Sequence, residues 1–160
     1  MYEVMPLKRE NIKRILQWND GQSADFLQQW AGRGYTYPLT TEQVERKLRC
    51  GDRIYEADFN GNIIGSIEIM EIVQETNIAQ IGRYILNPKE TGKGHGTEIL
   101  RVFSRYCFEN LGLTGLRLSV FDFNKNACRC YEKAGFIKDG ETKRPNGWIA
   151  IEMKLLPQFL

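Results

Sequence analysis

The chain has only one histidine, His95, and it has no run of apolar residues long enough to cross a membrane. A single histidine cannot build a His-based metal cluster, and no Ser-His-Asp triad is apparent, which argues against several large enzyme classes. Neither charge sign dominates, because 22 Lys and Arg residues against 20 Asp and Glu residues give a net charge of +2. We therefore expect neither nucleic acid nor a membrane surface as a partner.

Cysteine is sparse, and the four cysteines at positions 50, 107, 128 and 130 fit reduced, mostly buried thiols. Cys128 and Cys130 lie two residues apart in a helical stretch, so their side chains point about 200° apart and would clamp a metal poorly. The opening residues MYEVMPLKRE contain no apolar signal core. We therefore expect a cytoplasmic protein that binds no metal.

The composition is that of an ordinary globular protein, with 42% hydrophobic and 26% charged residues in 160. No repeat, low-complexity segment or linker interrupts the chain, so we predict one domain over residues 1–160.

The pattern of apolar residues predicts the elements along the chain. The first half reads as a strand at 2–6, a helix at 7–18, helices at 22–31 and 41–50, and strands at 54–59, 63–73 and 78–86. Asn60-Gly61 is a strong hairpin signal between the first two of these later strands. Both alternating sets of residues 63–73 are largely apolar, which predicts a strand covered on both faces.

The second half begins with a helical stripe formed by Ile99, Phe103, Cys107 and Leu111, with Gly112 as its C-terminal cap. A strand at 116–121, a helix at 125–134 and one final strand around 147–155 follow. The helix between strands 78–86 and 116–121 predicts a parallel pair with a right-handed crossover. The sheet is therefore mixed, and the fold class is α/β or α+β.

Glycines alternate at positions 92, 94 and 96, between a strand and a helix. Glycine loses much backbone entropy on folding, so this cluster predicts a backbone path that side chains would obstruct. Backbone N–H groups and the helix dipole at a helix start form an anion site suited to phosphate or pyrophosphate. A tight turn without a ligand is the alternative, and the neighbouring Lys93 favours the phosphate site.

Two familiar phosphate loops fit this stretch poorly. A P-loop needs Gly-x-x-x-x-Gly-Lys before Ser or Thr, whereas here Gly94 follows Lys93. A dinucleotide loop needs Gly-x-Gly-x-x-Gly in a parallel repeat, whereas here Gly-x-Gly-x-Gly follows hairpins.

A third loop fits well. The stretch TGKGHG (91–96) resembles the Q/R-x-x-G-x-G/A loop of the GNAT superfamily of acyl-CoA-dependent N-acetyltransferases. NKNACRCYEKAGF (124–136) resembles the second motif of that family, Asn-x-x-Ala-x-x-x-Tyr-x-x-x-Gly-Phe. The order of the motifs and of the predicted elements extends the resemblance over nearly the whole chain, and WAGRGYTYPLT (30–40) is similar to the RimJ/RimL-type branch. The resemblance implies a mixed, mostly antiparallel sheet flanked by helices on both faces.

The resemblance also implies where acetyl-CoA binds. Backbone amides of the glycine loop would hold the CoA pyrophosphate, at Gly92, Lys93, Gly94, His95, Gly96 and Thr97. The preceding strand would pair its backbone with the pantetheine arm, at Tyr84, Ile85 and Leu86. Thr91 replaces the Gln or Arg of the family, but the glycines carry the backbone geometry, so we expect binding to survive.

Acetyl transfer to an amine by direct attack needs a neutral amine, a polarised carbonyl and a protonated leaving thiolate, but no metal. The resemblance implies that Tyr131 is the general acid near the CoA sulfur. A phenol with a pKa of ~10 stays protonated until a thiolate with a pKa of roughly 8.5 develops. Packing on an amphipathic helix is the alternative role for Tyr131. Asn124 matches the family asparagine that hydrogen-bonds the cofactor arm, and it would serve equally as a helix N-cap.

The general base is left open. Some relatives have a glutamate on the strand before the second motif, where this chain has Ser119. Glu68 and Glu71 are alternatives, although a glutamate on a strand is more often a paired or exposed charge. His95 lies in the loop where the backbone matters most, so we interpret its side chain as loop filler.

The acceptor is also left open among a protein N-terminal amine, a polyamine, an amino acid and an antibiotic. Trp30, Tyr35 and Tyr37 either line its pocket or anchor a loop. We predict an N-acetyltransferase that acts on a primary amine of a small molecule or a peptide, and a homodimer is compatible with this. The competing hypothesis is a non-catalytic acyl-CoA-binding or sensory module, which the presence of Tyr131 disfavours.

Overall fold

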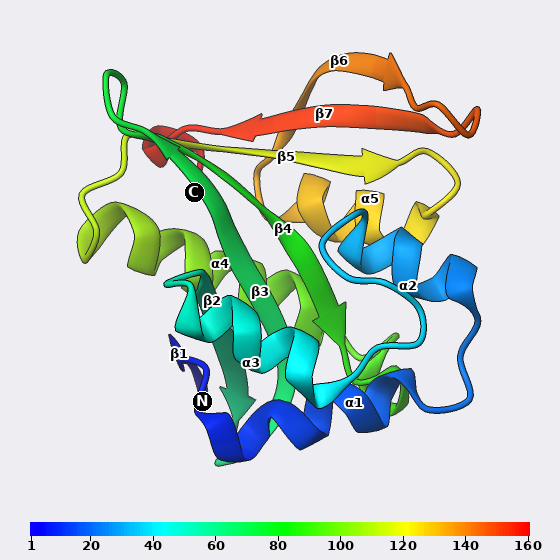
Figure 1. The fold of residues 1–160 in the computed structure, drawn as a ribbon. Helices are drawn as coiled ribbons and strands as arrows, with labels where there is room; N and C mark the ends of the chain where they lie inside the picture. The colour runs from blue at the N-terminus through cyan, green and yellow to red at the C-terminus, as the bar shows by residue number, and fades with distance from the viewer. The chain divides into compact units, whose positions relative to one another are not determined.

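The computed structural model describes residues 1–160 and contains one strand more than the sequence predicts (Figure 1). The strands are β1 (Tyr2–Pro6), β2 (Arg53–Phe59), β3 (Asn62–Val73), β4 (Ile78–Leu86), β5 (Gly115–Phe121), β6 (Ile137–Lys143) and β7 (Ile149–Leu155). The α-helices are α1 (Ile12–Asn19), α2 (Ala24–Ala31), α3 (Thr41–Arg49), α4 (His95–Glu109) and α5 (Lys125–Lys133). Short 3-10 helices are η1 (Arg9–Asn11), η2 (Pro88–Glu90) and η3 (Pro157–Phe159). No helix is both long enough and apolar enough to span a bilayer.

The strands form one sheet in the order β1-β2-β3-β4-β5-β7-β6. The pairs β1–β2, β2–β3, β5–β7 and β6–β7 are antiparallel. The strands β4 and β5 pair in parallel, residues 78–80 with residues 115–117. The predicted mixed, mostly antiparallel sheet is confirmed, and so is the parallel pair across α4.

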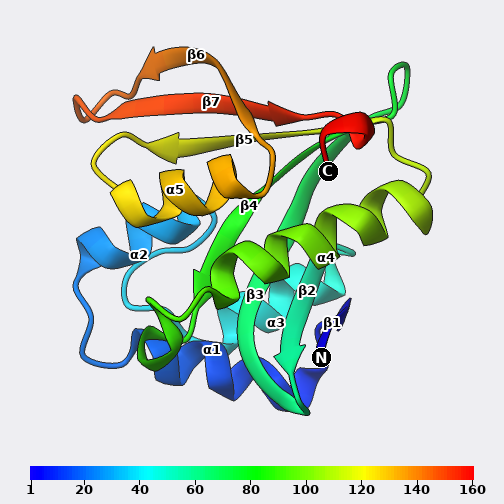
Figure 2. The ribbon, with the colours of Figure 1, turned by 180° about the vertical axis from the view of Figure 1, so that it is seen from behind.

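The chain divides into two compact units. The first unit consists of Met1–Met70 and Gly82–Lys93, and the second consists of Glu71–Ile81 and Gly94–Leu160. In the first unit, α3 lies against one face of β2 and β3 (Figures 1 and 2). Helix α1 buries Ile12, Ile15 and Trp18 at helical spacing, and they join Leu27, Val44 and Ile54 in one apolar cluster. The predicted helix at 7–18 begins later than expected, because residues 9–11 form the 3-10 turn η1.

The hairpin between β2 and β3 forms where Asn60-Gly61 predicts it. Both residues have a left-handed backbone, with φ of 52° and 86°, which matches the twist of a two-residue hairpin. The predicted burial of both faces of the next strand holds for residues 64–69 only. Met70 and Val73 are 44% and 40% exposed, because the apolar run is longer than the covered part of β3.

In the second unit, α4 buries Ile99, Leu100, Phe103 and Cys107 completely, as the helical stripe predicts. The helix ends at Glu109 with Asn110 as its C-cap, so Leu111 and Gly112 lie beyond it. Gly112 adopts a left-handed backbone with φ of 67° in the turn that follows. The predicted cap is therefore wrong by position, although a left-handed glycine does follow the helix.

The C-terminal part contains a hairpin, β6–β7, where the sequence predicts a single strand. The sequence of β6, IKDGETK, has no apolar alternation, and nearly all of its residues are exposed. Backbone pairing with β7 forms this edge strand, and such pairing leaves no hydrophobic signal in the sequence.

Candidate active site

The glycine turn has a left-handed backbone at two of its three glycines. Gly92 and Gly94 have φ of 77° and 84°, in the left-handed region that residues with a Cβ seldom adopt. A Cβ built at either position would meet no atom within 4 Å. The backbone conformation therefore calls for glycine here, whereas the predicted obstruction of side chains by neighbouring atoms is not found at these two positions.

Gly94 is the N-cap of the 15-residue helix α4. His95, Gly96 and Thr97 form the first turn of that helix and are buried, so the helix begins before the last of the three glycines. A first helical turn directs backbone N–H groups and the positive end of the helix dipole outward. Lys93 extends on the exposed side of the loop, where its Nζ lies 3.3 Å from Glu90 Oε2.

The strand that precedes the turn contains a feature that the sequence does not predict. Arg83 has a left-handed backbone with φ of 46° in the middle of β4. This conformation costs an ordinary residue about 1–2 kcal/mol. It lies directly before Tyr84, Ile85 and Leu86, and Ile85 is buried in the apolar cluster of the first unit. The unusual backbone of Arg83 therefore lies one residue before the predicted pantetheine contact.

The side chain of Arg83 is held on both sides. Its Nε donates to the carbonyl of Ala31 (3.2 Å), and its Nη1 donates to Glu68 Oε1 (3.2 Å). A Cβ on Gly34 would come within 2.0 Å of Arg83 Nε, so glycine at that position makes room for the guanidinium group.

Glu68 is the centre of a buried charge cluster. Its side chain is 3% exposed, and Lys47 Nζ lies 2.8 Å from the Oε1 atom that Arg83 also contacts. The hydroxyl of Tyr35 donates to Glu68 Oε2 (3.4 Å), and burial together with the Glu68 charge raises the pKa of Tyr35. Both carboxylate oxygens of Glu68 are thus engaged, Oε1 by two cations and Oε2 by a phenol. Glu68 is therefore a structural ion pair and a poor candidate for the general base.

Helix α5 and its N-cap contain Asn124 and Tyr131 of the second motif. Asn124 is its N-cap, and the Asn124 side-chain oxygen accepts from the backbone N–H of Ala127 (3.3 Å). Tyr131 is 6% exposed, and its ring packs edge-on against Phe136 with the centroids 5.7 Å apart. Burial raises the pKa of Tyr131, because a desolvated phenolate is unfavourable. The phenol therefore holds its proton throughout the neutral range.

A carboxylate lies on the strand next to Ser119, the position that the resemblance considers for a general base. Ser119 on β5 pairs with Glu152 on β7, and the Ser119 hydroxyl donates to Glu152 Oε2. The Thr142 hydroxyl donates to Glu152 Oε1 (3.0 Å), and Arg144 Nη2 lies 3.8 Å from the same atom. Sequence reasoning missed Glu152, because only strand pairing brings a residue 33 positions away next to Ser119.

The three N-terminal aromatic residues differ in their surroundings. The Trp30 indole donates to Asn19 Oδ1 (2.9 Å), and the Trp30 and Tyr35 ring centroids are 5.8 Å apart. Both residues therefore anchor the segment between α2 and α3. Tyr37 is 58% exposed. Of the three, only Tyr37 presents most of its surface to solvent.

No group of three or more His, Cys, Asp or Glu side chains is arranged to hold a metal ion. All four cysteines are free, but only Cys107 and Cys128 are buried, so the expectation of mostly buried thiols holds for two of the four.

Comparison with known proteins matches residues 15–136 to the acetyltransferase (GNAT) family. Over 73 residues the chain is 32% identical to an aminoglycoside N(6')-acetyltransferase type 1 of Klebsiella pneumoniae. This match covers 46% of this chain and 36% of that protein. Over 88 residues it is 31% identical to a spermidine N(1)-acetyltransferase of Vibrio cholerae. This match covers 55% of this chain and 50% of that protein. The matches thus span between about a third and a half of these relatives.

A solved structure extends the likeness in fold to the whole chain. The spermidine N-acetyltransferase from Vibrio cholerae in complex with CoA and spermine superposes with a TM-score of 0.82 at 20% identity. This superposition covers 99% of this chain and 96% of that one.

Proposed function

Because the chain belongs to the acetyltransferase (GNAT) family, we propose that it transfers an acetyl group from acetyl-CoA to a primary amine. The observation that carries the proposal is the left-handed turn at Gly92 and Gly94, which opens onto the start of α4. Such a helix start favours a pyrophosphate, and no atom lies within 4 Å of the position that a Cβ would take at either glycine. The amides of residues 92–97 would bind the diphosphate, and the backbone of Tyr84, Ile85 and Leu86 would bind the pantetheine arm.

Acetyl-CoA supplies an activated thioester, and the residues of the chain supply its binding and a proton. The neutral amine attacks the thioester carbonyl carbon, so a C–N bond forms and the C–S bond breaks. The departing thiolate takes the proton of the Tyr131 hydroxyl, and solvent returns a proton to the phenolate. The proton lost by the attacking amine passes to water. Asn124 would hold the cofactor arm in addition to capping α5.

Small amines are the favoured acceptors. The relatives are named for aminoglycosides and spermidine, which are small polyamino compounds. The RimJ/RimL-like branch and a peptide N-terminus as acceptor remain predictions, as do a cytoplasmic location and a single domain over residues 1–160.

The test is an acceptor screen with the whole chain. Acetyl-CoA is incubated with a polyamine, an aminoglycoside, amino acids and short peptides, and the release of free CoA thiol is followed. We expect thiol release that depends on the amine and yields the acetylated amine by mass spectrometry. Tight acetyl-CoA binding with no turnover on any amine would instead support the sensory module. A chain that does not bind acetyl-CoA would refute both.

A further inference from the structure

Arg83 has a backbone conformation that an arginine does not favour by itself. It lies in the middle of β4 with a left-handed φ of 46°, and the other two non-glycine residues with positive φ, Asn60 and Asn77, are both asparagines. Asparagine reaches this region by bonding locally to the backbone, whereas arginine has no such local compensation. The left-handed backbone of Arg83 must therefore be stabilised by contacts with other parts of the chain.

The guanidinium group supplies such contacts on two sides. Ala31 is the last residue of α2, where the carbonyl groups have no partner within the helix, and its carbonyl accepts from Arg83 Nε. A cation at this end of a helix also interacts favourably with the helix dipole. Glu68, which is almost completely buried on β3, accepts from Arg83 Nη1. The Arg83 side chain thus ties β4 to α2 and β3 within the first unit.

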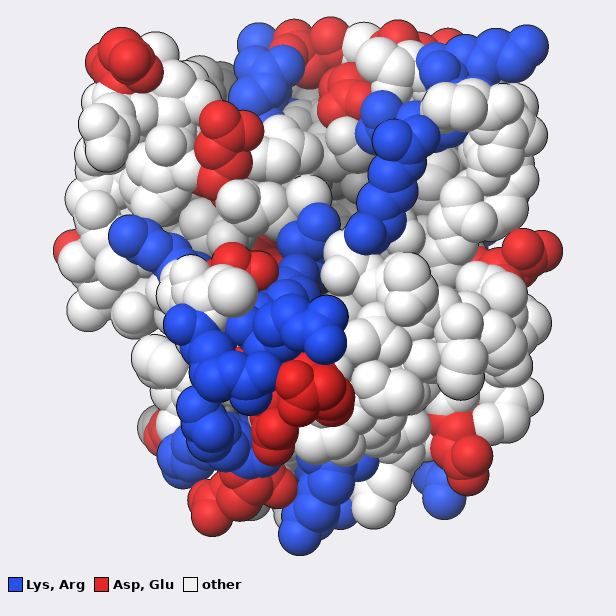
Figure 3. All heavy atoms as spheres, viewed as in Figure 1, with Lys and Arg blue, Asp and Glu red and all other residues white.

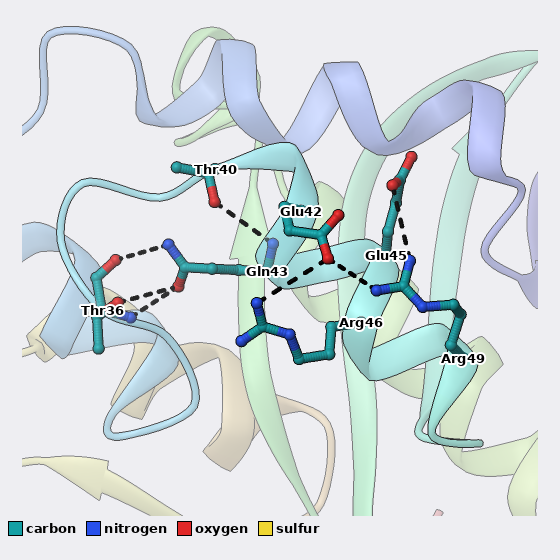
Figure 4. Close-up of polar contacts among 7 residues, drawn as sticks. All are labelled: Thr36, Thr40, Glu42, Gln43, Glu45, Arg46 and Arg49. Carbon is teal, nitrogen blue, oxygen red and sulfur yellow. Dashed lines mark hydrogen bonds and ion pairs between the residues drawn. The ribbon is translucent and has the colours of Figure 1, made fainter.

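The side that receives the guanidinium group is fixed independently of it. Gln43 of α3 donates to the carbonyls of Thr36 (3.0 Å) and Pro38 (2.9 Å), and it accepts from the Thr36 N–H (2.8 Å) (Figure 4). These bonds hold the segment that follows Gly34, and the missing side chain of Gly34 leaves the space that Arg83 Nε occupies. The position of the guanidinium group is therefore defined by residues outside β4.

The residues that follow Arg83 are also held by the chain itself. Ile85 is buried in the apolar cluster of the first unit, and the backbone N–H of Asn87 donates to the carbonyl of Ile64 (2.7 Å). An irregular residue in a strand redirects the residues after it. Residues 84–86 therefore have a course that is set before any ligand binds, and such preorganisation lowers the entropy cost of binding.

We propose that Arg83 is a positioning residue for acetyl-CoA. Its guanidinium group holds the left-handed backbone at position 83, and that backbone directs the main-chain groups of residues 84–86 to the pantetheine arm. Arg83 acts through these residues and does not itself contact the cofactor. This inference rests on the proposed function, and it assigns a role to a residue outside the predicted binding contacts.

Two substitutions at one position test the proposal. Arg83→Ala and Arg83→Gly both remove the guanidinium group, but glycine adopts a left-handed backbone freely and alanine does not. We expect the Kd of CoA, measured by calorimetry, to rise about tenfold in Arg83→Ala, because an alanine without the anchor leaves the left-handed region. In Arg83→Gly the Kd should stay within about threefold of the parent value, because the required backbone remains accessible.

A shorter ligand separates the pantetheine arm from the rest of the cofactor. The nucleotide part of CoA, adenosine 3′-phosphate 5′-diphosphate, keeps the diphosphate and lacks the arm. Its Kd should be the same in the parent and in both Arg83 variants, because the glycine turn is unchanged. A general loss of structure would instead weaken the binding of both ligands.

Gly34→Ala tests the anchor without a change in β4. Its methyl group would overlap Arg83 Nε, so the guanidinium group must leave its two acceptors. We expect the Kd of CoA to rise as it does in Arg83→Ala. Gly34→Ala should have no further effect when Arg83 is already alanine, because the two changes disrupt the same contact. This variant and Arg83→Gly also keep the test decisive if Arg83→Ala does not fold.

Arg46 is the matched control position. It is an arginine that pairs with a glutamate, Glu42, but its side chain is 65% exposed among the mixed charges on the surface of α3 (Figures 3 and 4). Neither Arg46→Ala nor Arg46→Gly should change the Kd of CoA. Glycine should be less stable than alanine at this helical position, whereas at position 83 glycine should be the more stable of the two in thermal unfolding.

CoA binding by Arg83→Ala that equals that of the parent would overturn the inference. Equal losses in Arg83→Ala and Arg83→Gly, or an equal loss for the nucleotide, would overturn it as well. The proposed function would stand in each of these cases if the parent acetylates an amine. A parent that shows the expected binding pattern but acetylates no amine would support the positioning role and refute the proposed function. A parent that does not bind CoA would refute both.

Discussion

Tyr131 is the residue on which the proposed chemistry depends most directly. If its hydroxyl protonates the departing thiolate, Tyr131→Phe removes that proton source and keeps the ring that packs on Phe136. General acid catalysis contributes about 10²–10⁴-fold, so kcat should fall within that range. Stability and acetyl-CoA affinity should be nearly unchanged, as measured by denaturant unfolding and calorimetry.

The pH dependence gives an independent measure of the same residue. Burial raises the pKa of Tyr131, so the acid form persists and kcat should show no decline from phenol ionisation up to about pH 10. The rate should instead rise with pH as the acceptor ammonium loses its proton. If Tyr131 has only a structural role, kcat of Tyr131→Phe should lie within a few-fold of the parent value. The substitution should then lower the free energy of unfolding instead.

A substitution at Glu68 distinguishes its role as a structural ion pair from a role as the general base. Glu68→Gln leaves Lys47 and Arg83 without their shared counter-charge, and breaking a buried pair costs about 3–5 kcal/mol. We expect a loss near the lower end of that range in the free energy of unfolding, because both cations are partly exposed. The pH profile of kcat should keep its shape at a temperature where the variant is folded. Glu71→Gln is the control on the same strand, where the side chain is exposed and the change should stay within about 0.5 kcal/mol.

At the scale of the element, the turn at the start of α4 can be tested by changing one glycine. Gly94→Val places a β-branched side chain at φ of 84° and fills the open space beside the turn. We expect acetyl-CoA affinity to fall at least about tenfold by calorimetry, because the side chain obstructs the diphosphate and disfavours the turn.

Gly112→Val is the matched control, since Gly112 also has a left-handed backbone and open space around it, in the turn after the same helix. Both variants carry similar backbone strain, so they should lose similar stability. Unchanged acetyl-CoA affinity in folded Gly94→Val would refute the assignment of the turn.

At the scale of the whole molecule, we predict that turnover is independent of metal. The donor set is poor, with one histidine and no cluster of three ligating side chains, and aminolysis of a thioester needs no Lewis acid. Exhaustive treatment with a chelator should leave kcat and KM unchanged. Activity lost on chelation and restored by a divalent ion would contradict the prediction.

Local sequence determined the elements that carry the site. Asn60-Gly61 specified a hairpin because only residues that tolerate positive φ form its turn. The stripe through Ile99, Phe103 and Cys107 predicted a buried helix, and the glycine cluster predicted an unusual backbone path before it, which Gly92 and Gly94 follow with positive φ. These features depend on backbone preferences and hydrophobic period, which neighbouring residues encode by themselves.

Tertiary structure alone decided the partners of Glu68 and Glu152. Glu68 is an ion pair because folding brings Lys47 of α3 and Arg83 of β4 to it, and Glu152 contacts Ser119 because β7 pairs with β5. Contacts between distant segments also accompany two features that the local pattern does not predict. The edge strand β6 forms by backbone pairing with β7, and the left-handed Arg83 has a side chain that is hydrogen-bonded to Ala31 and Glu68. The strength of an interaction between two charges depends on their distance and their solvent exposure. The positions of two residues in the sequence determine neither quantity when the residues lie on different helices or strands.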